Sequence, residues 1–253
     1  MFSGDLAYVA LVSNDVDAAA TVFERHLGLT RIDCAVGDGG RTAPVFSVGA
    51  SALAVFPTGD PFVGRHDKPG VHHVAFAATD LAAAGAAARV AGIATAESQP
   101  APGLDGRKRL ALAVEATVGV RAYLSEPLSL PRSNSVSIER IDHVGVASAD
   151  NEAAVGVFCG RMGYPLESRQ TDMEVQISVE SFTSDKYGAV YHNRPPQIVG
   201  GLRVAFVTVG DCELEFLQNF DPAQGGHVQH GAAGNTRQDQ GAIARYVASR
   251  GPG

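Results

Sequence analysis

The sequence has few cysteines, no long apolar run and no cluster of basic residues. Its three cysteines, Cys34, Cys159 and Cys212, are isolated, so they predict neither a disulfide framework nor a CxxC metal or redox site. Unpaired thiols suit the reducing cytoplasm, where we expect the protein to be found. The absence of any run of about 18 apolar residues argues against a transmembrane helix. The first residues also lack the basic start of a signal peptide.

The chain has few charged residues, and its net charge is slightly negative. The 253 residues include 20 Lys and Arg against 27 Asp and Glu, which gives a net charge of -7. A mildly acidic chain without basic clusters argues against nucleic acid and against anionic membranes as partners. Hydrophobic residues make up 45% of the chain, so we expect a folded globular protein with a sizeable core.

An internal repeat predicts the architecture. Residues 7–29, 72–93 and 142–164 each contain an alternating apolar strand, a polar turn with Asp, and an Ala-rich helix that ends at Gly. The expected helix N-caps are Asn14, Thr79 and Ser148, and the expected left-handed C-terminal residues are Gly28, Gly92 and Gly163. Strand candidates follow each helix, among them residues 108–116 in the second copy and 212–218 in the third.

These units predict an α+β fold built from repeated βαβββ modules. Two modules side by side make a cupped mixed or antiparallel sheet with its helices outside, and the concave face suits a binding site. The expected division of the chain is two paired modules in 1–128, a linker in 129–139, a third module in 140–220 and a connecting segment in 221–253.

On these features the chain resembles the vicinal oxygen chelate superfamily, which includes glyoxalase I, methylmalonyl-CoA epimerase, extradiol dioxygenases and fosfomycin-resistance proteins. The resemblance rests on the segments IDHVGVASAD, PGVHHVAFAATDLAAA and LRVAFVTVGDCELEFLQ. The last is most similar to methylmalonyl-CoA epimerases, and GAIARYVASRGPG resembles their connection between modules.

The resemblance implies a metal site made by a His near the start of a module's first strand and a Glu or Gln on its last strand. In the third module these positions fall on His143 and Glu215, which we expect to be metal ligands, with Glu215 also catalytic. Imidazole and carboxylate together suit Zn, Ni, Co, Mn or Fe. Glu213 shares a strand face with Glu215. The alternative is a hydrogen-bonded core His143 and a solvated Glu215.

The first two modules match the metal pattern poorly. Their corresponding positions fall on Tyr8 and approximately Leu53, and on His73 and approximately Tyr123. Neighbouring strand residues face opposite ways, so only one of His72 and His73 is expected to point into the cup. His73 is a candidate metal or substrate contact, with a hydrogen-bonding role as the alternative, and this pair of modules is expected to be metal-free.

Two further segments limit the assignment. Methylmalonyl-CoA epimerases carry a general-base Glu just before the strand that here reads LRVAF, where this chain has QIVGG. Proton transfer at carbon needs a base within reach, so the substitution argues against that particular activity. His227 and His230 form an HxxH pattern in a Gly-rich stretch, which is a weak metal signal compared with surface histidines.

The repeat count predicts a partner. Cups form from pairs, and the third module has no fourth to complete it. Residues 250–253 match the approach to the first strand of the second module. We therefore expect a complementary module carrying one His and one carboxylate, supplied by a second copy in a homodimer or by a partner chain.

The resemblance implies a metal-dependent isomerase, epimerase or lyase that acts on a small oxygenated or acyl-thioester substrate through an enolate-like intermediate. One alternative is a non-haem iron dioxygenase, which uses two His and one carboxylate and in which Glu215 would not usually be a ligand. A second alternative is a metal-free protein that binds a small molecule in an apolar cup. Metal content distinguishes the three.

Overall fold

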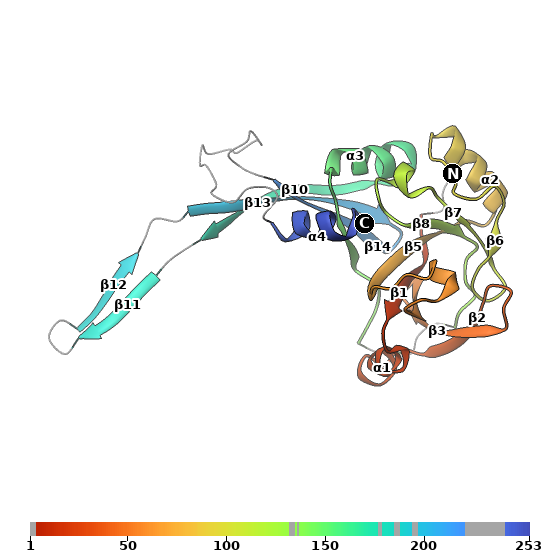
Figure 1. Cartoon of the computed structure of the whole chain (residues 1–253), viewed down its shortest axis with the longest axis horizontal. Coiled ribbons are helices and arrows are strands. Elements are labelled where there is room, and N and C mark those ends of the chain that lie inside the picture. The colour runs from red at the N-terminus through yellow and green to blue at the C-terminus, as the bar shows by residue number, and fades with distance from the viewer. Residues whose placement is uncertain are drawn as a thin grey trace.

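The computed structural model describes residues 4–131, 135, 137–176, 179–184, 188–193, 197–220 and 241–253. Two modules come first along the chain (Figure 1). The elements of module 1 are β1 (Leu6–Ser13), α1 (Val16–Thr21), its π-helical continuation η1 (Val22–His26), β2 (Arg31–Val36), β3 (Arg41–Val48) and β4 (Ser51–Pro57). After the short 3-10 helix η2 (Pro61–Val63), those of module 2 are β5 (Gly70–Ala77), α2 (Leu81–Val90), β6 (Ala101–Pro102), β7 (Lys108–Ala111), the 3-10 helix η3 (Val114–Thr117) and β8 (Ala122–Ser125).

Modules 1 and 2 share one eight-stranded sheet in the order β2-β3-β4-β1-β5-β8-β7-β6. In each module the first strand lies parallel to the last, β1 beside β4 and β5 beside β8. The modules join where β1 runs antiparallel to β5, with Val9 opposite Val74. The predicted α+β fold of βαβββ modules with mixed sheets is therefore confirmed.

The third module repeats this layout with an insertion. Its elements are β9 (His143–Ala147), α3 (Asn151–Val155), the π-helical η4 (Gly156–Arg161), β10 (Leu166–Gln176), β13 (Gln197–Val209) and β14 (Cys212–Phe220). They form a sheet in the order β10-β13-β14-β9, with β9 parallel to β14. Between β10 and β13, the strands β11 (Val179–Ser184) and β12 (Gly188–Asn193) make a separate hairpin that projects away from the body (Figure 1). Helix α4 (Ala242–Arg250) packs against β14 and β9.

Aspartates begin all three module helices. Asp15 accepts a hydrogen bond from the backbone of Ala18, and Asp80 does the same from Ala83. Asp150 accepts from two backbone N–H groups. The prediction of Asn14, Thr79 and Ser148 as N-caps was therefore wrong by one or two residues. Ser148 instead accepts a hydrogen bond from the backbone N–H of Asp150, which belongs to the turn before the helix.

The predicted glycine helix ends are confirmed, because Gly28, Gly92 and Gly163 have φ of 68°, 76° and 81°. The strand expected over 108–116 is shorter, however, since β7 ends at Ala111 and η3 follows. The buried hydroxyl of Thr117 donates to the carbonyl oxygen of Val120 at 2.6 Å, which stabilises the turn between η3 and β8.

Each sheet has a helix face and an opposite face, which we call the cup face. The cup face of the eight-stranded sheet is filled by its own core, which includes Tyr8, Phe56 and Phe62, and is covered by Leu128 and Leu130 from the following segment. The helix faces of modules 2 and 3 share another core (Figure 1). Its aromatic centre is formed by Phe76, Tyr164, Phe158 and Phe216, with Phe158 and Phe216 ring centroids 5.1 Å apart.

Candidate functional site

His143 and Glu215 lie together on the cup face of the third module. Residues 144 and 146 of β9, and 214 and 216 of β14, point into the helix-side core, so the alternate residues face the cup. The parallel register places Glu215 opposite Gly145, which has no side chain to separate it from His143. His143 Nε2 lies 3.5 Å from Glu215 Oε2, and the two side chains are 49% and 19% exposed.

Asp142 orients the imidazole of His143. Its Oδ2 lies 3.2 Å from Nδ1 of His143, and its Oδ1 lies 2.6 Å from Nη2 of Arg140. The hydrogen bond with His143 and then that with Arg140 lower the pKa of the Asp142 carboxyl. An ionised Asp142 favours a proton on Nδ1, which leaves the Nε2 lone pair directed towards Glu215. A carboxylate in this position is the usual second-shell partner of a metal-bound histidine.

Glu213 is the next carboxylate on the same face. It pairs directly with His143 across the two strands, and its backbone N–H donates to the carbonyl oxygen of Asp142 at 3.0 Å. Burial, followed by the negative charge of Glu167, raises the pKa of its carboxyl. It therefore extends the acidic character of this face beside Glu215.

The donor set fits half of a metal site. One imidazole nitrogen and one carboxylate oxygen converge, and both are good ligands for divalent transition metals. Catalytic metals usually take about three protein ligands, and the part of the chain that the structure describes contains no group of three or more candidate ligands. His143 and Glu215 therefore need further ligands from elsewhere to complete a centre.

The outer edge of β9 is where the third module differs most from the first. Module 1 has β5 along the equivalent edge of β1, with Val12 opposite Gly70. Among the described residues, β9 is the last strand of its sheet, and Gly253 donates its N–H to the carbonyl oxygen of Ala147 at 2.9 Å. A cavity of about 570 Å³ lies beside this edge and is lined by residues of β9, α4 and β5.

The cup of the first two modules is closed around an aromatic and cationic cluster. Tyr8 and His73 are 0% and 2% exposed, and the Tyr8 hydroxyl lies 3.4 Å from His73 Nε2. The ring centroids of His73 and Tyr123 are 4.4 Å apart. The guanidinium of Arg109 lies 3.6 Å above the ring of Phe62 and 4.6 Å from that of Tyr123. His73 therefore sits in a packed aromatic environment.

The strict alternation of side chains on which the expectation for His72 and His73 rested is broken in β5. The register of β1 and β5 shifts between Ala10 opposite His73 and Leu11 opposite Val71, so His72 is an extra residue in a β-bulge. A bulge breaks the alternation of side chains. Both rings consequently meet, with their Nδ1 atoms 2.7 Å apart.

Leu53 is not the counterpart of Glu215 in module 1. It pairs with Val9 and packs on the helix-side cores, so it faces away from Tyr8. The next residue, Ala54, pairs with Ala10 and lies in the cup-face core. A one-residue change of register moves a side chain to the other face, which is why the approximate alignment missed this position.

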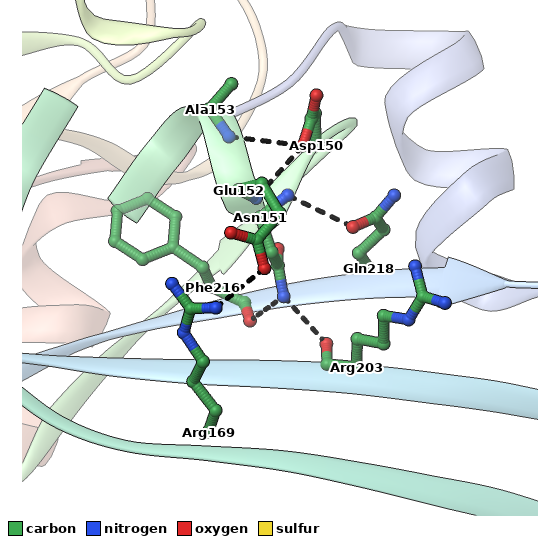
Figure 2. A network of polar contacts seen from close by, with 8 residues as sticks. All are labelled: Asp150, Asn151, Glu152, Ala153, Arg169, Arg203, Phe216 and Gln218. Carbon is green, nitrogen blue, oxygen red and sulfur yellow. Dashed lines mark hydrogen bonds and ion pairs between the residues drawn. The ribbon is translucent and has the colours of Figure 1, made fainter. Parts of the chain in front are cut away.

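A second polar cluster surrounds Asn151 at the start of α3 (Figure 2). Its side-chain Nδ2 donates to the carbonyl oxygens of Arg203 and Phe216, both at 3.0 Å, and its backbone N–H donates to Oε1 of Gln218 at 3.0 Å. These bonds attach α3 to β13 and β14. The residue that follows the N-cap is Val16 in α1 and Leu81 in α2, so Asn151 replaces an apolar residue at this position of the repeat.

Some sequence features lie elsewhere. His227 and His230 lie outside the described residues, as does most of the expected connecting segment. The described residues contain no helix long and apolar enough to cross a membrane.

Comparisons with known proteins give one family and one fold. Residues 5–121 match the model of the Glyoxalase/Bleomycin resistance protein/Dioxygenase superfamily. A mutant of 4-hydroxymandelate synthase from Streptomyces coelicolor is similar over 100% of this chain and 69% of its own, at 18% identity and a TM-score of 0.61. Methylmalonyl-CoA epimerase from Mycobacterium tuberculosis covers 49% of this chain and 88% of its own, at 21% identity and a TM-score of 0.43. No curated protein sequence matches the chain.

Proposed function

Because the chain belongs, through residues 5–121, to the Glyoxalase/Bleomycin resistance protein/Dioxygenase superfamily, we propose that its third module supplies half of a divalent-metal centre. The centre belongs to an enzyme that acts on a small oxygenated substrate. The single observation that carries this proposal is the approach of His143 Nε2 to Glu215 Oε2 at 3.5 Å on an open sheet face.

In the leading form of this proposal the enzyme is an isomerase or lyase. His143 and Glu215 both hold the metal, which supplies Lewis-acid polarisation of substrate oxygens when bound. Asp142 fixes the His143 ring so that Nε2 is the coordinating nitrogen. Glu215 is also the carboxylate placed to accept a substrate proton, since it lies beside the metal position and is 19% exposed.

A second candidate is a non-haem iron dioxygenase. It is favoured by the contrast between a closed N-terminal cup, packed around Tyr8 and His73, and an open third module. In this form His143 remains a ligand and Glu215 does not, because the site takes two His and one carboxylate and keeps positions open for oxygen and substrate.

Either form needs a complementary module, and we place it along the outer edge of β9. Gly253 donates to Ala147 there, at the position that corresponds to Gly70 beside Val12 in the first pair. An unpaired edge strand is a template for another strand. The module comes from a second copy of the chain or from another polypeptide segment, and it brings one His and one carboxylate.

Metal titration of two carboxylate variants tests the proposal. Metal-free protein with Glu215→Gln is titrated with Co²⁺, Zn²⁺ and Fe²⁺, with Glu213→Gln as the matched control on the same face. For an isomerase or lyase, Glu215→Gln lowers metal affinity by more than the roughly 10–100-fold typical of second-shell changes, while the control binds normally. For a dioxygenase, Glu215→Gln binds normally, His143→Ala does not, and Fe²⁺ supports oxygen consumption. Wild-type protein without measurable metal affinity in any assembly state would refute both forms.

Solution mass tests the complementary module separately. Light scattering combined with metal analysis gives the number of metal ions per chain. A second copy as the source predicts a dimer, with the metal bound only in the dimeric fraction. A monomer that binds one metal tightly through this chain alone contradicts the need for a partner.

A further inference from the structure

Arg109 is a buried cation in the closed N-terminal cup, and no described residue forms an ion pair with it. The residue is 9% exposed, and none of the ion pairs among the described residues includes it. Its Nη2 donates to the carbonyl oxygen of Phe62 at 2.9 Å. Its Nε and Nη1 atoms are buried and have no hydrogen-bond acceptor in the part of the chain that the structure describes.

Burial of Arg109 in this way lowers the stability of the folded state unless another group compensates the charge and accepts hydrogen bonds from the unmatched N–H groups. A buried guanidinium loses the solvation of its charge, and each unmatched N–H group loses a hydrogen bond to water. Contacts with the rings of Phe62 and Tyr123 stabilise the flat faces of the guanidinium, but they supply no acceptor to its edge. The edge is therefore the unsatisfied part.

The neighbouring groups are arranged to receive negative charge. Burial lowers the pKa of His72 to about 3 and that of His73 well below its usual range, so both rings are neutral and neither offsets nor adds to the positive charge of Arg109. Burial raises the pKa of Tyr8 to about 12, while the charge of Arg109 acts in the opposite direction. Tyr8 is therefore a protonated hydroxyl beside the guanidinium and can donate a hydrogen bond.

We propose that the closed N-terminal cup binds a small monovalent anion, of the size of chloride or formate, through the unmatched N–H groups of Arg109 and the hydroxyl of Tyr8. The anion satisfies the guanidinium edge and neutralises the charge of Arg109. The packing of Phe56, Phe62 and the covering Leu128 and Leu130 restricts the site to small ions. The cavity beside β9 reaches His72 and His73, which places the path by which the ion enters and leaves on that side of the cluster.

Thermal unfolding in exchanged salts tests this site in the full chain. Sodium gluconate is replaced by sodium chloride, bromide or formate at constant ionic strength, because gluconate is too large for the cup. The wild-type Tm is expected to rise by roughly 3–5 °C for each tenfold increase of the small anion above its Kd. Arg109→Met removes the charge, fills a similar volume between the two rings, and is expected to abolish the rise.

Two further variants make the result decisive. Arg89→Met removes the same charge from the exposed end of α2 and is expected to keep the full anion effect. Tyr8→Phe keeps the ring, removes the hydroxyl and is expected to shift the anion dependence to higher concentration, which also provides a test if Arg109→Met does not fold. A wild-type Tm that is equal in gluconate and chloride, as a buried water beside Arg109 would give, overturns the proposal. An equal chloride response in wild type and Arg109→Met overturns it as well.

Discussion

The paired N-terminal modules and the third module have the same strand order, but the side chains on their cup faces differ in kind. In the first pair, Tyr8 occupies the place of His143, and Ala54 and Tyr123 occupy the place of Glu215. Those side chains lie in one core cluster. The third module presents a half-exposed imidazole and a carboxylate instead. The comparison teaches that the βαβββ layout provides a cup, while a few side chains decide whether it becomes a core or a site.

The largest effect is expected when the equivalent histidines of the two cups, His143 and His73, are each replaced. We expect His143→Ala to lower the affinity for Co²⁺ by more than about 100-fold, because it removes a proposed ligand rather than a second-shell group. His73→Ala, in the closed cup, is expected to leave Co²⁺ affinity unchanged. Absorbance titration of metal-free protein measures both. The opposite ranking would place the metal in the N-terminal cup and reverse the assignment of the two cups.

The helices of modules 1 and 3 carry a phenylalanine at the same position, and the two residues offer a matched test of stability. Phe158 in η4 is fully buried and contacts the rings of Phe76 and Phe216, so Phe158→Ala is expected to cost about 3–5 kcal/mol of unfolding free energy. Phe23, at the same position of η1, is only partly buried and contacts Phe46, so Phe23→Ala is expected to cost clearly less. Urea unfolding of both variants gives the ranking. Equal costs would show that the helix-side core joining modules 2 and 3 contributes no more than the packing of α1.

The closed cup predicts a pH dependence of stability. His72, with a pKa of about 3, and His73, with a pKa well below its usual range, are neutral in the folded protein but bind protons near pH 6.5 when unfolded. The unfolded state therefore binds more protons below pH 6.5, and stability that is complete above this pH is lost as the pH falls towards 3. We expect a loss of about 1.4 kcal/mol per pH unit for each of the two rings.

Unfolding in urea between pH 7 and pH 5 measures this slope. His72→Gln is expected to reduce it by one proton, whereas His26→Gln, at an exposed position in η1, is expected to leave it unchanged. A slope that persists in His72→Gln would assign the pH dependence to groups outside the closed cup.

The smallest expected effect concerns the helix caps. Asp150 accepts two backbone hydrogen bonds and Asp15 accepts one. We expect Asp150→Ala and Asp15→Ala to cost about 1 kcal/mol each, with the larger cost at Asp150. Asp17→Ala, exposed in the first turn of α1, serves as control and is expected to cost a few tenths of a kcal/mol. Costs at Asp15 and Asp150 no larger than that of Asp17 would contradict the capping role.

Local signals in the sequence were enough for the module plan. Alternating apolar residues, an Asp turn and a Gly helix end recur three times, and each recurrence is a strand, a helix and a left-handed turn in the structure. Cap positions were wrong by one or two residues, because Asn14, Thr79 and Ser148 are chemically as suitable as the aspartates that follow them. The choice depends on where the chain leaves the sheet, which no local pattern encodes.

Side-chain environments were harder to predict. No local pattern singled out Arg109, yet its guanidinium bonds the carbonyl oxygen of Phe62, which is 47 residues away. Asn151 was not recognised as a buried anchor, because its partners Arg203 and Phe216 are more than 50 residues further along the chain. Contacts over such separations depend on the register of strands that the sequence does not align by itself.

The sequence by itself determined the repeated modules, the faces of their strands and the chemical types of His143 and Glu215, because alternation and capping are local properties of the chain. Only the tertiary structure decided that the bulge at His72 brings two imidazoles together and that the first cup closes over Arg109. It also decided that no other described strand pairs with the outer edge of β9. These outcomes depend on strand register and on burial. Both arise when distant segments pack together, so local residue patterns do not encode them.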